Sequence, residues 1–398
     1  MQLQRRNPPA EPVYLDYQAT TPTDPRVVDA MLPYFTEHFG NPHSAQHRHG
    51  SVAEEAVETA RGEVAGLIGA QPNEIIFTSG ATEANNLALI GGLRFRRAQG
   101  RDHLVTATTE HKCVIESARA LEGEGASVTF LPVRPDGLIE LDRLAAAITP
   151  RTALVSIMAV NNEIGVIQPL AEIAALAHAK GAWFHSDAAQ AAGKIPLDVE
   201  AMGIDLMSLS AHKLYGPKGI GALYVRRRPR VRLAPLFHGG GQERGLRSGT
   251  LPTPLCVGFG AAAAIAAAEM ATESARLAGL GRRLLAGLRA ALPETTLQGS
   301  AEQRIPGNLN VAFPGIDADR LLAALPELSL STGSACSSAA VEPSYVMTAL
   351  GLDAAAARGA VRIGLGRFTT EAEVDFAVER LVAGVRSLRR EPAAAAAP

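Results

Sequence analysis

Short apolar runs alternate with helix-length segments through the first two-thirds of the sequence, and this alternation constrains the fold more than any other feature. The apolar runs lead directly into polar clusters, which are TSGATE, TEHK, NNEIG, DAAQ and SAHK. Strands of four to eight residues separated by helices are typical of a mostly parallel sheet with helices on both faces. Ligands of such sheets bind at the carboxyl ends of the strands. The sequence therefore predicts an α/β fold whose functional residues lie in these clusters.

The length of the chain predicts two domains. A single hydrophobic core stops growing at roughly 250 to 300 residues, and this chain has 398. We expect a large domain over residues 14–262 and a small α+β domain over residues 263–390. Residues 1–13 are assigned to the small domain, which also carries the loop around Cys336. The tail, residues 391–398, lacks core-forming side chains, which predicts disorder.

Composition argues for a small-molecule substrate. The formal net charge is −2, so the sequence has no electrostatic footprint for nucleic acid or an anionic membrane. The apolar tract from Leu255 to Met270 is mostly alanine, and we interpret it as a buried or inter-lobe helix, part of a long helix from Pro254 to Leu292, not as a membrane span. The N-terminus lacks the apolar stretch of a signal peptide. Three separated cysteines without a C-x-x-C pair suit a reducing compartment, so we expect a cytoplasmic protein.

Lys213 follows an apolar run in the segment SLSAHKLYGPKG. In one interpretation it is a surface lysine that begins a turn before Gly216 and Pro217, because lysine is rarely buried. In the other interpretation burial lowers its pKa, and its amine forms a Schiff base with an aldehyde cofactor. The residue alone leaves both interpretations open.

Asp187 follows a second apolar run, in HSDAAQ. It could cap a helix that begins at Ala188. Alternatively, a buried carboxylate here could face the pyridine nitrogen of pyridoxal phosphate and keep it protonated, which makes the ring an electron sink.

Two further segments are candidate anion sites. In TSGATE, residues 78–82 supply small side chains and backbone N–H groups at a helix start, which suits a phosphate. The same pattern also fits an ordinary turn with Thr82 as the cap and Glu83 in the first helical turn. The glycine-rich HGGGQERGLRSGT, which ends at Thr250, is either a flexible loop or an anion-binding one.

The cysteines divide into two kinds by their surroundings. Cys336 lies in STGSACSSAAVEPS, where Gly, Ser and Ala favour a mobile loop and an exposed, reactive thiol. Cys113 and Cys256 lie in apolar, helix-like segments, so we expect both in the core.

The histidines do not predict a metal site. His43, His47 and His49 lie close in sequence, but no carboxylate or cysteine accompanies them at ligand spacing. His111 ends a strand in TEHK, where its ring could stack on a planar cofactor or simply complete a hydrogen-bonded turn.

Taken in order along the chain, these motifs resemble the class I cysteine desulfurases, the NifS/IscS type, within the aspartate-aminotransferase-like fold of pyridoxal-phosphate enzymes. The likeness runs from LDYQATTP, at Leu15 to Pro22, to LGRFTTEAEVD, at Leu365 to Asp375. HGGGQERGLRSGTLP and GSACSSAAVEPSYV make it specific. The resemblance implies a large domain with a mostly parallel, seven-stranded type of sheet, a small α+β domain and the cofactor pyridoxal 5'-phosphate.

The resemblance also implies roles for individual residues. Lys213 corresponds to the Schiff-base lysine, Asp187 to the partner of the pyridinium nitrogen and His111 to the ring stacked on the cofactor. Asn162 and Gln190 correspond to contacts with the phenolic oxygen or the substrate carboxylate. The residues that correspond to the phosphate site are Ala81, Thr82, Ser210, His212 and, from the neighbouring subunit of a homodimer, Thr250. Arg362 corresponds to the clamp on the substrate carboxylate, because a planar guanidinium can bind both oxygens.

The implied reaction converts L-cysteine to L-alanine and leaves its sulfur as a persulfide on Cys336, from which an acceptor protein such as an iron–sulfur scaffold removes it. His111 or another local base is expected to take the thiol proton. Cys113 stands where the family commonly has alanine. The tail EPAAAAAP replaces the family's C-terminal extension, which leaves the acceptor open.

The motifs leave three alternatives. A selenocysteine lyase or a class V aminotransferase would share the cofactor, and an aminotransferase would not need Cys336. A non-catalytic sulfur carrier with the same fold would not need Lys213, Asp187 and His111.

Overall fold

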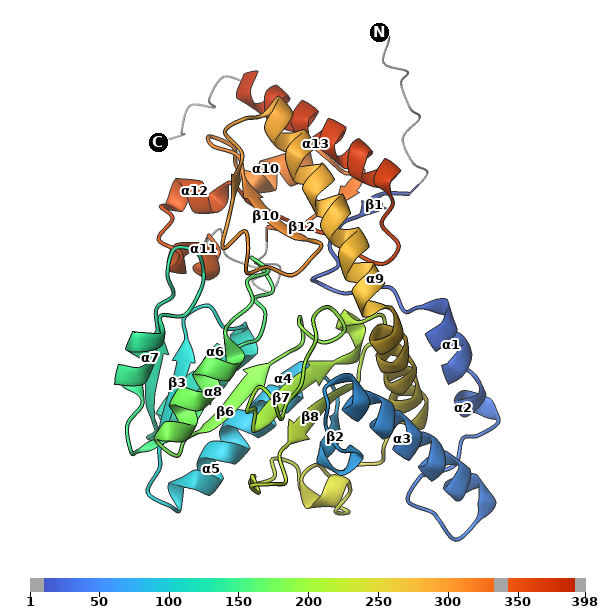
Figure 1. The fold of residues 1–398 in the computed structure, drawn as a ribbon. Helices are drawn as coiled ribbons and strands as arrows, with labels where there is room; N and C mark the ends of the chain where they lie inside the picture. The colour runs from blue at the N-terminus through green and yellow to red at the C-terminus, as the bar shows by residue number, and fades with distance from the viewer. Residues whose placement is uncertain (1–10, 333–342, 391–398) are drawn as a thin grey trace. The chain divides into compact units, whose positions relative to one another are not determined.

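The computed structural model describes residues 11–332 and 343–390 (Figure 1). Cys336 and the tail from Glu391 therefore lie outside the described residues. The chain forms two compact units. The large unit comprises residues 20–161 and 166–271, and the small unit comprises the described parts of residues 1–19, 162–165 and 272–398.

The large unit is built on a seven-stranded sheet (Figure 1). Its strands are β2 (Ile75–Thr78), β3 (His103–Ala107), β4 (Ser127–Leu131), β5 (Thr152–Ser156), β6 (Trp183–Asp187), β7 (Leu206–Ser210) and β8 (Gly221–Val225). Their order is β2-β8-β7-β6-β5-β3-β4, and β8 alone runs antiparallel to its neighbours. Most of these strands are buried along their whole length, as expected for a sheet covered on both faces. The predicted, mostly parallel sheet is confirmed.

Helices connect and cover these strands. They are α1 (Pro25–Met31), α2 (Pro33–Thr36), α3 (Arg48–Leu67), α4 (Ala81–Asn86), α5 (Gly92–Arg97), α6 (Lys112–Gly123), α7 (Leu141–Ala147) and α8 (Leu170–Ala179). A π-helical turn, Leu87–Gly91, joins α4 directly to α5. Leu87 and Leu93 from this continuous helical stretch pack with Leu121 of α6 against buried strand residues such as Leu104 and Leu154. Burial of these side chains holds α4 and α6, which follow β2 and β3, against the sheet.

The small unit contains a three-stranded antiparallel sheet in the order β12-β10-β9. Its strands are β9 (Thr296–Leu297), β10 (Asn308–Ala312) and β12 (Ala360–Gly364), and a separate parallel pair is formed by β1 (Val13–Tyr14) and β11 (Leu328–Ser329). Its helices are α10 (Ala318–Ala323), α11 (Tyr345–Ala349), α12 (Ala354–Arg358) and α13 (Glu371–Arg390). Leu381 and Val385 of α13 pack with Val311 and Val361 in one core. The predicted α+β character of this part is confirmed.

Helix α9 (Thr253–Ala291) is 39 residues long, close to the predicted helix over 254–292. It is long and apolar enough to cross a membrane by length and composition alone, a test that core helices of soluble proteins also pass. Its side chains pack in the protein: Phe259 is buried in the large unit, and Leu284 and Leu288 are buried in the core of the small unit. A Cβ at Gly260 would lie 2.5 Å from the Cα of Ala60, so glycine permits α9 to approach α3 closely.

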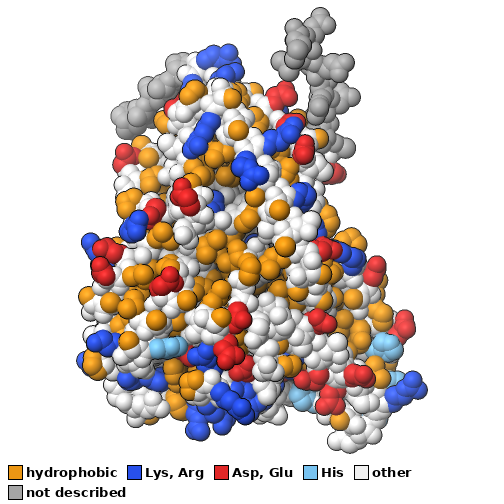
Figure 2. Space-filling model, viewed as in Figure 1, with side chains coloured by type: hydrophobic (Ala, Val, Ile, Leu, Met, Phe, Trp, Pro, Cys, Tyr) orange, Lys and Arg blue, Asp and Glu red, His pale blue; other side chains and the backbone are white. Residues whose placement is uncertain are grey.

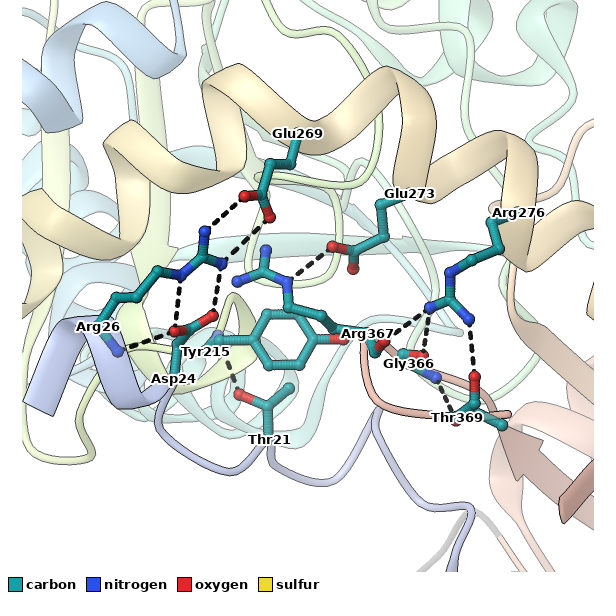
Figure 3. A network of polar contacts seen from close by, with 10 residues as sticks. All are labelled: Thr21, Asp24, Arg26, Tyr215, Glu269, Glu273, Arg276, Gly366, Arg367 and Thr369. Atoms are coloured by element: carbon teal, nitrogen blue, oxygen red, sulfur yellow. Dashed lines mark hydrogen bonds and ion pairs between the residues drawn. The ribbon is translucent and has the colours of Figure 1, made fainter. Parts of the chain in front are cut away.

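Arginine side chains anchor α9 within each unit (Figure 3). In the large unit, Arg26 forms ion pairs with Asp24 and with Glu269 of α9. In the small unit, Arg276 of α9 donates to the carbonyl oxygens of Arg367 and Thr369, both at 2.7 Å. The two contacts of Arg276 satisfy backbone carbonyls that lie outside regular secondary structure.

On the face shown in Figure 2, Lys and Arg side chains are interspersed with Asp, Glu and apolar side chains. This mixture is consistent with a net charge of −2.

Candidate active site

Four of the predicted polar clusters gather at one edge of the large sheet. Strand β2 is antiparallel to β8 and β8 is antiparallel to β7, so β2 runs in the same direction as β7, β6, β5 and β3. The residues at and just after the ends of β2, β3, β6 and β7 therefore share the carboxyl edge, where ligands of such sheets bind. These residues are Thr82, His111, Asp187 and Lys213.

Lys213 ends a 3₁₀ turn (Ala211–Lys213) that follows β7, and its backbone is fixed by the segment around Thr21. The Thr21 N–H and the Thr21 hydroxyl each donate to the carbonyl oxygen of His212 at 3.0 Å. The N–H of Tyr215 in turn donates to Oγ1 of Thr21 at 2.9 Å, a contact that Figure 3 shows. Tyr215 has a φ of 66°, in the region that glycine favours, so the turn is held by these contacts against its own preference. The Lys213 side chain is half-buried.

Asp187 is the last residue of β6 and is 4% exposed. Its Oδ1 accepts a hydrogen bond from the N–H of Ala189 at 2.9 Å, and its Oδ2 accepts one from Nδ2 of Asn85 at 2.7 Å. The chain forms a turn after Asp187, so the alternative of a helix beginning at Ala188 is wrong, although the carboxylate still accepts from a nearby N–H. A carboxylate has lone pairs for further donors, so Asp187 can also accept from a ligand.

His111 is the N-cap residue of α6, and its Nδ1 accepts from the N–H of Cys113. Burial lowers the pKa of His111; the Asp187 carboxylate opposes this shift and the positive charge of Lys213 adds to it. His111, Asp187 and Lys213 therefore lie close enough for their charges to interact. The structure brings together the three side chains that the resemblance assigns to the cofactor's ring and aldehyde.

The turn after β2 has the features of an anion cradle. Gly80 is the N-cap of α4 with a φ of 153°, and no side chain caps this helix, so the alternative of Thr82 as the cap is wrong. Ala81 and Thr82 are the first helical residues, whose N–H groups have no partner within the helix. Glu83 occupies the first turn as expected and accepts from the N–H of Ser79 at 2.7 Å.

Ser210 and His212 lie beside this edge at the end of β7. Ser210 is buried. Nδ1 of His212 lies 3.0 Å from the Thr20 hydroxyl, and burial, with the charges of Lys213, Lys218 and Lys194, lowers the pKa of His212 to about 4. A neutral His212 can offer one ring N–H to an anion.

Thr250 lies in the glycine-rich segment and is exposed. Nε of Arg247, three residues earlier, lies 2.9 Å from Oε1 of Glu83, so this segment is tied to the first turn of α4. Gln190 is buried beyond β6, where its Oε1 accepts from Nζ of Lys194 at 2.8 Å.

The small unit contains the other two predicted site residues, Arg362 and Asn162. Arg362 lies in the middle of β12 and is 3% exposed. Its Nη1 donates to the carbonyl oxygen of Asn162 at 3.1 Å, and its Nη2 lies 2.7 Å from Oδ1 of Asp16. Within the described residues, Nε of Arg362 and Oδ1 of Asn162 are buried polar atoms without a hydrogen-bond partner. Buried groups of this kind are normally satisfied, so they suit a polar ligand.

The residues of the large unit fit pyridoxal phosphate by their chemistry. An amine, a buried carboxylate and an imidazole lie near a helix start with free N–H groups. These groups match the aldehyde, the pyridine nitrogen, the ring face and the phosphate of the cofactor.

Metal ligands do not gather anywhere in the described parts of the chain. In those parts, no group of three or more His, Cys, Asp or Glu side chains is placed to hold a metal ion. The ring of His49 instead contacts the rings of His47 and Phe39.

Sequence reasoning missed two residues of this site, Asn85 and Cys113. Asn85 is fully buried, and its Nδ2 contacts both Asp187 and Cys113. Cys256 is buried as predicted, and Cys113 packs against the core as predicted but also places its sulfur 3.0 Å from Nδ1 of His111. The signal for Asn85 was its place one helical turn after Ala81, which directs it back toward the strand ends.

The family model of the aminotransferase class-V proteins matches residues 13–376, and the chain belongs to this family. A cysteine desulfurase of Homo sapiens is 55% identical over 382 residues, which are 96% of this chain and 83% of that protein. The cysteine desulfurase IscS of Rickettsia bellii is 55% identical over 378 residues, which are 95% of this chain and 92% of that protein.

Solved structures agree with these relatives. A NifS-like protein has a TM-score of 0.88 at 37% identity, with 95% of this chain and 100% of that chain covered. A structure of SspA in complex with cysteine has a TM-score of 0.78 at 40% identity, with 90% of this chain and 100% of that chain covered. The resemblance and the fold class predicted from the sequence are confirmed.

Proposed function

We propose that this chain is a pyridoxal-phosphate-dependent cysteine desulfurase. The observation that carries the proposal is the cluster of Lys213, Asp187 and His111 at the carboxyl edge of the sheet, in a chain 55% identical to proteins named cysteine desulfurase. When bound, pyridoxal phosphate supplies an aldehyde for amines and a ring that stabilises negative charge at a substrate Cα.

Lys213 and Asp187 hold the two ends of the cofactor ring in this proposal. The Lys213 amine binds the aldehyde and is the group positioned to move a proton at the substrate Cα. The Asp187 carboxylate faces the pyridine nitrogen, and its contacts with Asn85 and Ala189 fix its orientation. The N–H groups of Ala81 and Thr82, with Ser210 and His212, receive the phosphate.

The substrate carboxylate is assigned to Arg362. Its Nε is buried without a partner in the described residues, and a carboxylate would satisfy it. Asn162 and Gln190 offer amide groups for the remaining polar atoms of substrate and cofactor.

The sulfur-transfer step is assigned to Cys336. Its thiolate attacks the substrate sulfur, the C–S bond of the substrate breaks, and the electron pair of that bond returns to the carbon that becomes the methyl group of alanine. Cysteine and the thiol of Cys336 thus become alanine and a persulfide on Cys336, without an outside oxidant or reductant. We further propose a homodimer in which Thr250 of one subunit contacts the phosphate bound by the other, a sulfur-acceptor protein and a reducing, cytoplasmic compartment.

The test is to mix the purified full-length protein, loaded with pyridoxal phosphate, with L-cysteine. We expect alanine in solution and a mass increase of one sulfur atom on the peptide that contains Cys336. Cys336→Ala should abolish alanine release, while Cys256→Ala, at a buried thiol in α9, should retain it.

Four results would change the assignment. Undiminished alanine release by Cys336→Ala would refute the role of this thiol. Amino-group transfer to a keto acid would favour an aminotransferase, and a large preference for selenocysteine would favour a lyase. A protein that takes up no pyridoxal phosphate would favour a non-catalytic carrier.

A further inference from the structure

We propose that Cys113 is a positioning residue for His111, and that its thiol and its backbone N–H together hold the imidazole as the neutral tautomer with its proton on Nε2. The importance of this tautomer for catalysis rests on the proposed function. The tautomer itself follows from hydrogen-bond directions around His111, Cys113, Asn85 and Asp187.

The first fixed direction is a backbone donor. Nδ1 of His111 lies 3.3 Å from the backbone N of Cys113, in the N-cap geometry that begins α6. A backbone N–H can only donate, so Nδ1 must present a lone pair. A neutral imidazole with a lone pair on Nδ1 carries its proton on Nε2.

The second fixed direction comes from Asp187. Its Oδ2 lies 2.7 Å from Nδ2 of Asn85. An ionised carboxylate only accepts, so the amide NH₂ of Asn85 faces it. The second hydrogen of that NH₂ is directed at Sγ of Cys113, 3.1 Å away.

The thiol of Cys113 completes the series. Its sulfur accepts from Asn85 and lies 3.0 Å from Nδ1 of His111, which has no proton to give. The hydroxyl of Thr82 also contacts this thiol and, since the contact lowers the thiol pKa, donates to the sulfur, so we assign the S–H of Cys113 to Nδ1. Donation runs in one sense, from Asn85 to Cys113 and from Cys113 to His111.

The charge states of the neighbouring groups agree with these directions. Burial raises the pKa of Cys113 to about 12, and the nearby Asp187 charge acts in the same direction, so Cys113 keeps its S–H at neutral pH. Burial lowers the pKa of His111, with Asp187 opposing and Lys213 adding to the shift. Glu110, which precedes His111, is fully buried, and burial raises its pKa well above the usual value.

This arrangement limits what His111 can do before the reaction starts. Nε2 carries a hydrogen, so the resting ring donates there and does not accept a proton. The ring can accept a proton only at Nδ1. A proton there would displace the S–H of Cys113 and would face the backbone N–H of the same residue, which is also a donor. His111 is thereby prepared to orient an acceptor atom through Nε2–H, and the thiolate of Cys336 must be generated by another group.

The tautomer can be measured directly. The full-length protein, labelled with ¹⁵N-histidine, gives long-range ¹H–¹⁵N spectra that distinguish protonated from unprotonated ring nitrogens. The His111 signals are those missing from His111→Gln. We expect an unprotonated Nδ1 and a protonated Nε2, and a ring protonated on Nδ1 in the neutral state would overturn the proposal.

Two variants isolate the thiol. Cys113→Ala removes the S–H donor and leaves the backbone N–H, and loss of one neutral hydrogen bond should lower the ratio of the two tautomers about fivefold. Cys113→Ser retains a donor and should keep the ratio near that of the wild type. An unchanged ratio in Cys113→Ala would show that the thiol does not position the ring.

The measurement is made on the protein without added pyridoxal phosphate and repeated with it. The tautomer without cofactor does not depend on whether cysteine is a substrate. A wrong tautomer would therefore refute this inference and leave the desulfurase assignment standing, while absence of alanine release would do the reverse.

Discussion

Thr21 is expected to stabilise the turn that carries Lys213, and Thr21→Val tests this role. Valine has nearly the same shape as threonine but cannot accept the hydrogen bond from the N–H of Tyr215, which is 2.9 Å from Oγ1 in the present structure. Thr21 is 1% exposed, so water cannot readily replace the lost acceptor. A buried N–H without a partner costs about 1–3 kcal/mol.

That cost predicts a local change in hydrogen exchange. A loss of about 1–3 kcal/mol corresponds to about 5- to 150-fold in an equilibrium constant, so the amide protection of residues 211–216 should fall by this factor. Native-state hydrogen exchange followed by mass spectrometry measures it on the full-length protein. The carbonyl of His212 loses only one of its two donors, since the Thr21 N–H remains.

Thr295→Val is the matched control. The hydroxyl of Thr295 is also buried, but it only donates, to the carbonyl oxygen of Leu292, which the N–H of Thr295 also contacts. Its removal leaves no N–H without an acceptor, so protection near residue 295 should fall much less. Unchanged protection at 211–216 in Thr21→Val, or an equal loss in the control, would refute the role of Thr21.

Three further predictions concern stability. Burial raises the pKa of Glu163, whose carboxyl accepts from Ser344, to about 7, so the folded state binds a proton more tightly than the unfolded state and the free energy of unfolding should fall as pH rises from about 4.5 to about 7. Glu163→Gln should remove this pH dependence and raise the free energy of unfolding in urea by up to roughly 3 kcal/mol above pH 7. A wild-type protein that becomes more stable over this pH range would contradict the prediction. Glu243→Gln removes the buried partner of Arg61, since both side chains are 3% exposed and 2.8 Å apart, and leaves the guanidinium paired with the exposed carboxylate of Glu58 at 2.9 Å. It should therefore destabilise the protein by up to about 3–5 kcal/mol. Glu116→Gln, which breaks an exposed pair with Arg119, should cost at most about 1 kcal/mol, and equal thermal shifts in the two variants would contradict this prediction. Gly260→Ala should destabilise the protein, because the new Cβ would lie 2.5 Å from the Cα of Ala60 and overpacking costs about 1–3 kcal/mol. This cost opposes the helix propensity of alanine, which exceeds that of glycine by about 1 kcal/mol. A raised melting temperature would show that α3 can move away from α9 and would contradict the prediction.

Much of the fold could be predicted because it depends on local patterns. Continuous apolar runs identify buried strands, and the stretch rich in Ala, Leu and Arg, with few breakers after Gly260, identifies α9. The reversed direction of β8 could not be predicted, because strand direction does not alter hydrophobic periodicity. The predicted positions of Lys213, Asp187 and His111 in the polar clusters follow from the rule that strand ends share an edge.

The details of the site depend on geometry that sequence does not carry. The alternative of a helix after Asp187 is wrong, because the residues that follow form turns. Gly193, six residues later, has a φ of 71°, which an α-helix does not permit. Cys113 has an apolar sequence environment, yet its place in the first turn of α6 brings its sulfur to the ring of His111. Asn85 is separated from Asp187 by 102 positions, so only the folded chain joins them.

The most direct test of the account is to find which lysine binds pyridoxal phosphate. Borohydride reduction of the loaded, full-length protein followed by peptide mass spectrometry should place the label on Lys213. The other lysines, which are Lys112, Lys180, Lys194 and Lys218, should remain unmodified. A label on one of them in place of Lys213, or no label on any, would contradict the central claim that the carboxyl edge of the sheet is the cofactor site.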